Sequence, residues 1–172
     1  MQPLTLGDGA GDLAPILFDE GLAGGSVSRG VYTLFFAPGV IQEALLAMQL
    51  PHGYLAGSDL KPHIHWSPSD DNTGDVVWGV EYTFINASAV FPDTTSLEAT
   101  DTCDGGLKHQ IVNLGTIPGI GSSNDTSSML LARVYRKGDD ANDTYSGAAA
   151  LLEFDIHYQS NRAGTVAEFG PN

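Results

Sequence analysis

The alternation of residues 76–84 constrains the fold more than any other feature of this sequence. Large apolar side chains occupy every second position of that segment, at Val76, Trp78, Val80, Tyr82 and Phe84. Successive side chains of a β-strand point to opposite faces of its sheet, so these five share one face. The segment therefore predicts a strand that buries one strongly apolar face.

Shorter apolar runs between clusters of Gly, Pro, Asp and Asn predict further strands. They cover residues 31–37, 60–66, 107–114, 129–136 and 146–158. Pro62 must lie at the start of its strand or on a sheet edge, because proline has no N–H for the ladder. Residues 41–50 fit both helical and strand spacing, and we favour a strand. We expect the last two segments to form a hairpin with its turn at residues 138–142.

The size and composition suit one folded domain, since the 172 residues are 42% hydrophobic and 16% charged. The 21 Gly and 9 Pro indicate many turns. About eight strands without a clear helix predict an all-β protein, a two-sheet antiparallel sandwich with a jelly roll as the favoured topology. An immunoglobulin-like sandwich is the alternative, although its usual pair of cysteines is missing.

Both ends of the chain are predicted to be extended arms. Residues 1–14 form an N-terminal arm, residues 15–159 the β-sandwich domain, and residues 160–172 a C-terminal arm. The arms are rich in Gly, Asp, Asn and Ser and have little apolar surface to bury. We expect them to be ordered only through contact with neighbouring chains.

The charge balance excludes several classes of partner. Seven Lys and Arg against 21 Asp and Glu give a net charge of −14, which would repel a polyanion such as DNA. The acidic clusters at residues 70–75, 101–104 and 139–143 are expected to form solvated turns. No apolar stretch approaches the roughly 20 residues of a membrane helix, and the N-terminus lacks the features of a signal peptide. We expect a soluble protein made in the cytosol, with no direct nucleic-acid or membrane partner.

Two histidines are the main candidates for a binding site. His63 and His65 are separated by one residue on a predicted strand, so both imidazoles point to one face about 7 Å apart. Together with His157 they could bind a divalent metal, as a cupin does. The Glu that a cupin places a few residues later is absent after His65. We therefore favour cross-strand hydrogen bonding or a subunit interface for these histidines, and we predict no cofactor.

No catalytic residue is predicted, so we expect a protein that is not an enzyme. The sequence has no Gly-x-Ser-x-Gly elbow, and the Gly-rich residues 115–121 lack the Gly-Lys-Ser/Thr of a phosphate-binding loop. Cys103 is the single cysteine and has no disulfide partner in the chain. The nearby Asp101 and Asp104 are expected to raise the pKa of its thiol. An ion-paired polar face could contain Glu81, Arg133, Glu153 and Asp155.

Four segments resemble small virion structural proteins of tailed bacteriophages. They are Leu50-Pro51-His52-Gly53-Tyr54, Lys61-Pro62-His63-Ile64-His65-Trp66, Val77-Trp78-Gly79-Val80-Glu81-Tyr82 and Leu151-Leu152-Glu153-Phe154-Asp155-Ile156-His157-Tyr158. The resemblance implies a capsid decoration (cement) protein with a jelly-roll body, or else a tail or fibre protein with a similar body.

As a decoration protein, the chain would bind the outer capsid surface of the virion and stabilise contacts between major capsid protein subunits. Its partners would be the major capsid protein and further copies of itself, as a homotrimer or a homodimer. The first alternative is a tail fibre or receptor-binding module that recognises host surface glycans. The second is a cupin-like metalloprotein that uses His63, His65 and His157.

Overall fold

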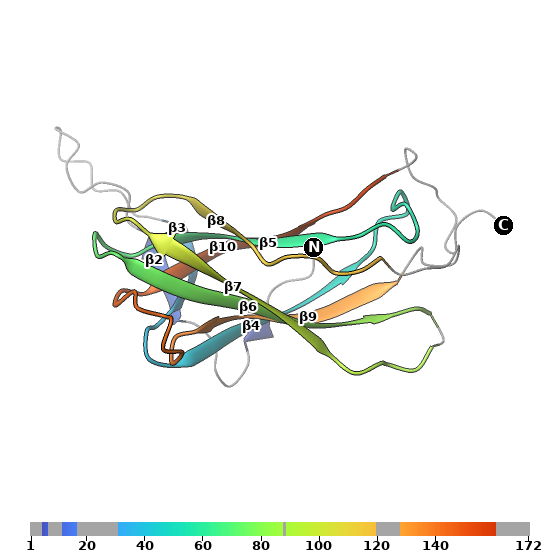
Figure 1. Ribbon diagram of the computed structural model, residues 1–172, viewed down its shortest axis with the longest axis horizontal. Coiled ribbons are helices and arrows are strands. Elements are labelled where there is room, and N and C mark those ends of the chain that lie inside the picture. The colour runs from blue at the N-terminus through green and yellow to red at the C-terminus, as the bar shows by residue number, and fades with distance from the viewer. Residues whose placement is uncertain (1–4, 7–11, 17–30, 88, 120–127, 161–172) are drawn as a thin grey trace.

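The chain folds as a β-sandwich in the computed structural model, which describes residues 5–6, 12–16, 31–87, 89–119 and 128–160 (Figure 1). The strands are β1 (Thr5–Leu6), β2 (Asp12–Ile16), β3 (Val31–Phe36), β4 (Ile41–Gln49), β5 (Lys61–Pro68), β6 (Gly74–Ile85), β7 (Thr95–Cys103), β8 (Gln110–Asn113), β9 (Met129–Lys137) and β10 (Ala149–His157). The described segments contain no helix, and hence none that is long and apolar enough to cross a membrane.

The described strands form two five-stranded antiparallel sheets. The β6 sheet has the order β1-β4-β9-β6-β7, and the β5 sheet has the order β2-β3-β10-β5-β8. Four pairs are nested in sequence: β6 with β7, β5 with β8, β4 with β9, and β3 with β10. A ribbon of such pairs, rolled so that alternate pairs enter opposite sheets, is a jelly roll. The predicted jelly-roll sandwich is therefore confirmed, and this strand order excludes the immunoglobulin-like alternative.

The core lies between the two sheets and is built from alternate residues of each strand. Val76, Trp78 and Val80 of β6 are fully buried, so the predicted apolar stripe does face inward. Ile64 and Trp66 of β5 are fully buried on the opposite side of the core. Because Ile64 and Trp66 point inward, the residues at positions 63 and 65 point to the outer face of the β5 sheet.

The predicted hairpin of the last two strands is wrong. β9 pairs with β4 and β6, whereas β10 pairs with β3 and β5 in the other sheet. The connection between them passes the buried Arg136, whose guanidinium donates to the backbone carbonyls of Tyr145 and Gly147. Arg136 also donates to both carboxylate oxygens of Asp143, whose side chain is fully buried. Consecutive strands usually lie side by side. β9 and β10 do not, and the ion pair of Arg136 with Asp143 lies where the chain crosses from one sheet to the other.

Two acidic residues that were predicted to lie in solvated turns are structural instead. Residues 95–103 form β7, which was not among the predicted strands, and Asp101 lies within it. The carboxylate of Asp101 accepts a 2.8 Å hydrogen bond from the indole nitrogen of Trp66. Asp143 belongs to the buried ion pair just described. Asp71, by contrast, is exposed as expected.

Part of the predicted N-terminal arm belongs to the sandwich. β1 pairs with β4, and β2 pairs with β3, within the same chain. This pairing differs from the expectation of an arm that only neighbouring chains would order. At the other end, Ser160 forms a bridge with Tyr54. The rest of the predicted C-terminal arm, residues 161–172, lies outside the described residues.

Candidate functional site

The candidate site lies on the outer face of the β5 sheet, where three neighbouring strands present their outward residues. On β10, Asp155 stands opposite His63 of β5. On the other side of β5, Ile111 of β8 stands opposite His65. We name these outward residues the histidine face, which consists of His63, His65, Ile111, Asn113, Glu153, Asp155 and His157, with His109 immediately before β8.

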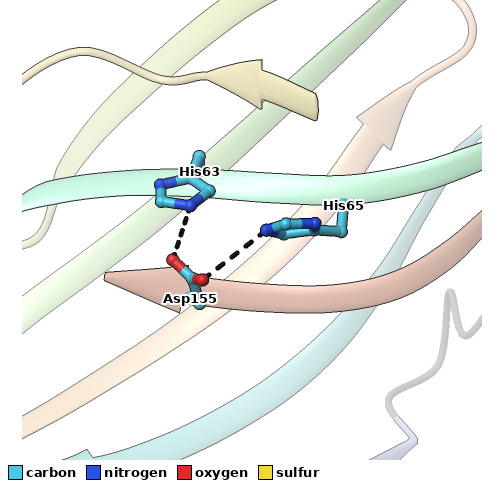
Figure 2. A group of neighbouring side chains, drawn as sticks. All are labelled: His63, His65 and Asp155. Atoms are coloured by element: carbon cyan, nitrogen blue, oxygen red, sulfur yellow. Dashed lines mark ion pairs between the residues drawn. The ribbon is translucent and has the colours of Figure 1, made fainter. Parts of the chain in front are cut away.

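Asp155 lies between the two histidines of β5 and approaches both of them (Figure 2). Its Oδ1 is 2.8 Å from Nε2 of His63, and its Oδ2 is 3.5 Å from Nε2 of His65. The histidine side chains are 11% and 19% exposed, and that of Asp155 is 33% exposed. One donor atom from each of the three residues lies within 4.8 Å of the other two. Imidazole nitrogens and carboxylate oxygens bind divalent first-row metals, so the group is a candidate metal centre.

Contacts on the far side of each ring orient both imidazoles. Nδ1 of His63 lies 3.3 Å from the backbone carbonyl oxygen of Lys61, which can only accept, so Nδ1 carries the proton in this contact. Nδ1 of His65 lies 2.7 Å from Nε2 of His109, and the two rings stack with centroids 4.9 Å apart. A proton on Nδ1 of His65 gives this residue the same tautomer. Neutral histidines of this tautomer turn an Nε2 lone pair toward Asp155.

Two buried atoms of the group have no hydrogen-bond partner among the described residues. They are Nε2 of His65 and Oδ1 of Asp155. Oδ1 of Asp155 and Nε2 of His63 are close enough for an ion pair, yet they lack the angles of a hydrogen bond. A buried polar atom without a partner costs about 1–3 kcal/mol. A cation placed between the three side chains would provide a partner for both atoms.

The structure brings the three predicted site residues onto one face, but only His63 and His65 belong to the group of converging donor atoms. The ring of His157 lies beside that of His63, with centroids 4.3 Å apart, but Asp155 completes the group of donor atoms. All of these side chains lie on the outer face of a sheet, whereas a cupin holds its metal inside a barrel. The predicted cross-strand hydrogen bonding is present for His65, whose Nδ1 lies 2.7 Å from Nε2 of His109, whereas His63 approaches Asp155 on β10 without the angles of a hydrogen bond.

The outer face of the β6 sheet carries a separate network of polar side chains. Arg133 donates to Glu81 at 2.6 Å and to Glu43 at 2.8 Å. Glu153 and Asp155 lie on the histidine face of the other sheet. The predicted polar face that combined Glu81, Arg133, Glu153 and Asp155 is therefore divided between opposite sides of the molecule.

Tyr135 covers the centre of that network. A Cβ atom added to Gly79 would lie 2.3 Å from Cζ of Tyr135, so the ring rests directly on the glycine. The Tyr135 hydroxyl donates to Glu98 at 2.8 Å, and the guanidinium of Arg133 lies 4.7 Å from the ring centroid. Burial, together with the hydrogen bond to Glu98, raises the pKa of Tyr135 to about 12. This face is thus filled by interactions within the chain.

Cys103 is buried at the end of β7. Burial raises the pKa of its thiol, and the charges of Asp104 and Asp70 raise it further. The predicted direction of the shift is confirmed, with burial rather than charge as the largest cause. A thiol that stays protonated is a poor nucleophile.

No protein-family model matches this sequence, and no curated protein matches it significantly. Among solved structures, the CBM22-1 xylan-binding domain of Xyn10C from Paenibacillus barcinonensis matches with a TM-score of 0.40 and 14% identity, over 88% of this chain and 97% of that domain. TmCBM61, solved in complex with β-1,4-galactotriose, matches with a TM-score of 0.36 and 12% identity, over 77% of this chain and 74% of its own. The likeness concerns the β-sandwich fold alone. Nothing in these comparisons indicates a phage origin or a capsid partner.

Of the side chains that contact His63 and His65, those of Asp155 and His109 were not predicted as metal-site residues. Asp155 alternates with Phe154 and Ile156, which pack against the core, so the period of two already placed it beside His157. His109 precedes the short strand β8 and reaches His65 only because β8 pairs with β5. No spacing within the sequence specifies that register.

Proposed function

We propose that this protein is a non-catalytic binding module that recognises a carbohydrate on the histidine face. The observation that carries the proposal is that hydrogen-bonding side chains and flat rings lie together on three adjacent strands of one sheet. A sugar presents hydroxyl groups at its edge and C–H groups on its faces. Polar side chains combined with exposed flat rings bind both kinds of group.

The polar groups of this face are exposed on both sides of β5. Glu153 on β10 is exposed and makes no hydrogen bond or ion pair within the described residues. Asn113 on β8 is also exposed, and its Oδ1 accepts a 2.8 Å hydrogen bond from the backbone nitrogen of Gly115. That contact leaves the side-chain amide nitrogen of Asn113 to donate to a ligand.

The flat rings of the face are imidazoles. His109 is exposed and stacks on His65, with 22° between the ring planes. His157 is exposed beside His63. The stacked pair holds the His109 ring in place before any ligand arrives, which reduces the entropy lost on binding.

The charge of the chain narrows the class of carbohydrate. A net charge of −14 disfavours sulfated, phosphorylated or uronic-acid polymers. Glu153 and Asp155 add local negative charge to the face itself. The proposed ligand is therefore a neutral glycan, bound through its hydroxyl groups.

A glycan array containing neutral and acidic polymers, with xylan and β-1,4-galactan among them, tests this proposal on the full chain. We expect binding to neutral members only. Titration calorimetry with the best ligand should show binding weakened at least about tenfold by Glu153→Ala and by His109→Ala, equivalent to roughly 1.4 kcal/mol each.

The matched control is Thr100→Ala, at an exposed position of β7 in the other sheet. It should bind like the wild type. Failure of the wild type to bind any neutral glycan would refute the proposal, and so would unchanged affinity in both histidine-face variants.

Capsid decoration is the alternative, and it is supported by the sequence resemblance to virion proteins. It requires binding to the outer surface of a capsid, which co-sedimentation of the purified chain with phage capsids would measure. Capsid binding without glycan binding would favour decoration over carbohydrate recognition. Glycan binding that Glu153→Ala removes would favour the reverse.

A further inference from the structure

We propose that the histidine face holds one divalent transition-metal ion, bound by Nε2 of His63, Nε2 of His65 and a carboxylate oxygen of Asp155. This site goes beyond the proposed carbohydrate recognition and does not depend on it. His63 and His65 come from β5 and Asp155 from the neighbouring β10, and Figure 2 shows both imidazoles directed at the carboxylate of Asp155.

The separations between the donor atoms suit a tetrahedral ion. Metal–ligand bonds of about 2.0–2.1 Å place tetrahedral ligand atoms roughly 3.4 Å apart. The distance from His65 Nε2 to Asp155 Oδ2 is 3.5 Å, and that from His63 Nε2 to Asp155 Oδ1 is 2.8 Å. All three donor atoms lie within 4.8 Å of one another. Shifts of the three donor atoms by less than about an ångström, on the order of thermal motion, would therefore bring them to the separations that a bound ion requires.

The hydrogen bonds of the two imidazoles favour a cation at this point. Nδ1 of His63 donates a hydrogen bond to the Lys61 carbonyl, and Nε2 of His109 is positioned to accept one from Nδ1 of His65. Metal-binding histidines characteristically donate their other ring N–H to such a partner, which raises the basicity of the ligating nitrogen. When His63 is neutral with its proton on Nδ1, its Nε2 lone pair faces a carboxylate oxygen at 2.8 Å, and a metal ion between the two atoms removes their repulsion.

The same cation explains the two buried atoms that lack partners. Nε2 of His65 and Oδ1 of Asp155 both belong to the proposed ligand set. If the three side chains formed hydrogen bonds only with one another, these two atoms would have partners. Unsatisfied atoms from two different residues that converge on one point are what a ligand site requires.

The type of donor selects the class of metal. Two imidazole nitrogens and one carboxylate suit Zn²⁺ and its first-row neighbours, whereas Ca²⁺ and Mg²⁺ prefer sites made of oxygen atoms only. Three protein ligands leave a tetrahedral ion one open position for water or another small ligand. The nearby charges of Glu153 and of Asp155 itself favour the binding of a cation on this face.

The test uses the full chain without a polyhistidine tag, freed of metal by chelation, and ZnCl₂ alone as the probe. Titration calorimetry should give one Zn²⁺ per chain, and Co²⁺ should give the visible absorption of a tetrahedral site. Asp155→Asn, His63→Gln and His65→Gln should each weaken binding more than about 100-fold, because an outer-shell partner alone costs about 10–100-fold. His109→Gln is expected within that outer-shell range.

Two controls keep the ligand set falsifiable. His52→Gln removes a histidine of the loop between β4 and β5 and should leave Zn²⁺ affinity unchanged. His157→Gln should change it less than about threefold, below the loss typical of even an outer-shell partner. Thermal unfolding of each metal-free variant verifies its fold. No stoichiometric binding by the wild type, unchanged affinity in Asp155→Asn, or a loss in His157→Gln as large as in Asp155→Asn would each overturn the proposal.

The metal and carbohydrate proposals fail separately in these experiments. Zinc binding is measured without glycan, and the glycan array is repeated in the presence of a chelator. Zinc binding without glycan binding would leave the metal site standing alone. Glycan binding in a chain that binds no Zn²⁺ would overturn the metal site and leave carbohydrate recognition intact.

Discussion

Arg136 is a charged residue whose side chain is fully buried. Its five hydrogen bonds to Asp143, Tyr145, Gly147 and Phe36 use every N–H donor of the guanidinium. Asp143 also accepts a 3.0 Å hydrogen bond from the backbone nitrogen of Val77. The pair thus ties the connection after β9 to strands of both sheets. Removing one member would leave the other charge buried without compensation.

We expect Asp143→Ala to lower the free energy of unfolding by about 3–5 kcal/mol, because it leaves the buried Arg136 guanidinium without a counter-charge. Chemical denaturation monitored by tryptophan fluorescence measures the change. The control is Asp104→Ala, which breaks a solvent-exposed ion pair with Lys108 and should have hardly any effect. Equal losses of stability in the two variants would contradict this assignment.

The role of Asp143 could not be predicted from its own surroundings in the sequence. It lies in an acidic, turn-like cluster with Asp139 and Asp140. The available signal was Arg136, which occupies the same alternating positions as the core residues Val134 and Ala132. A charged residue on the apolar side of a strand requires a buried partner of opposite charge. The sequence does not specify which of the many acids provides it.

Single strands were more predictable than the pairs they form. Apolar stripes identified β3, β5, β6, β9 and β10, since burial on one face leaves a period of two. β7 was missed because only Leu97, Ala99 and Cys103 mark its inner face among polar residues. The partner of each strand depends on contacts between distant segments, so the supposed hairpin of β9 and β10 was wrong.

The contact between β6 and β9 at Gly79 can be tested by one added methyl group. Gly79→Ala would place Cβ 2.3 Å from the Tyr135 ring, which must then move away from Glu98. We expect a loss of about 1–3 kcal/mol of stability from this overpacking. In a Tyr135→Ala background the same change should be neutral or stabilising, because glycine weakens a strand interior.

A double-mutant cycle measures the difference between these two backgrounds. The two single variants, the double variant and the wild type are compared by chemical denaturation at neutral pH, where the Tyr135 hydroxyl is protonated because its pKa is about 12. If Gly79→Ala costs the same with and without the Tyr135 ring, steric contact is not the cause of its effect.

The fold class could be predicted from the sequence, whereas the functional surface could be predicted only in part. Many short strands, frequent turns and the absence of a helical period favour a sandwich. The sequence also placed His63 and His65 on one face. Asp155 and His109 join them through the pairing of β10 and β8 with β5, which is a property of the assembled sheet. The site therefore exists only in the tertiary structure.

The nested pairs have a kinetic consequence. β6 and β7 are joined by a short connection, whereas the β3–β10 pair includes the contact of Thr33 with Leu151, 118 positions away. Distant pairing is slow because closing a long loop costs entropy before any contact repays it. The β6–β7 pair is therefore expected to form first, the pairs of more distant strands are expected to follow, and β10 is expected to join the β5 sheet last. Asp155 then meets His63 only after the rate-limiting barrier.

Zinc bound between these strands should consequently slow unfolding and leave the folding rate nearly unchanged, because contacts absent from the transition state act on the unfolding limb alone. Stopped-flow refolding and unfolding, with and without saturating Zn²⁺, measure the two limbs, and Asp155→Asn serves as the control. Faster refolding of the wild type with Zn²⁺ would mean that β5 and β10 meet early. If β10 is the last strand to join the β5 sheet, its detachment separates Asp155 from His63 and His65. Zn²⁺ should therefore dissociate at least as fast as β10 detaches.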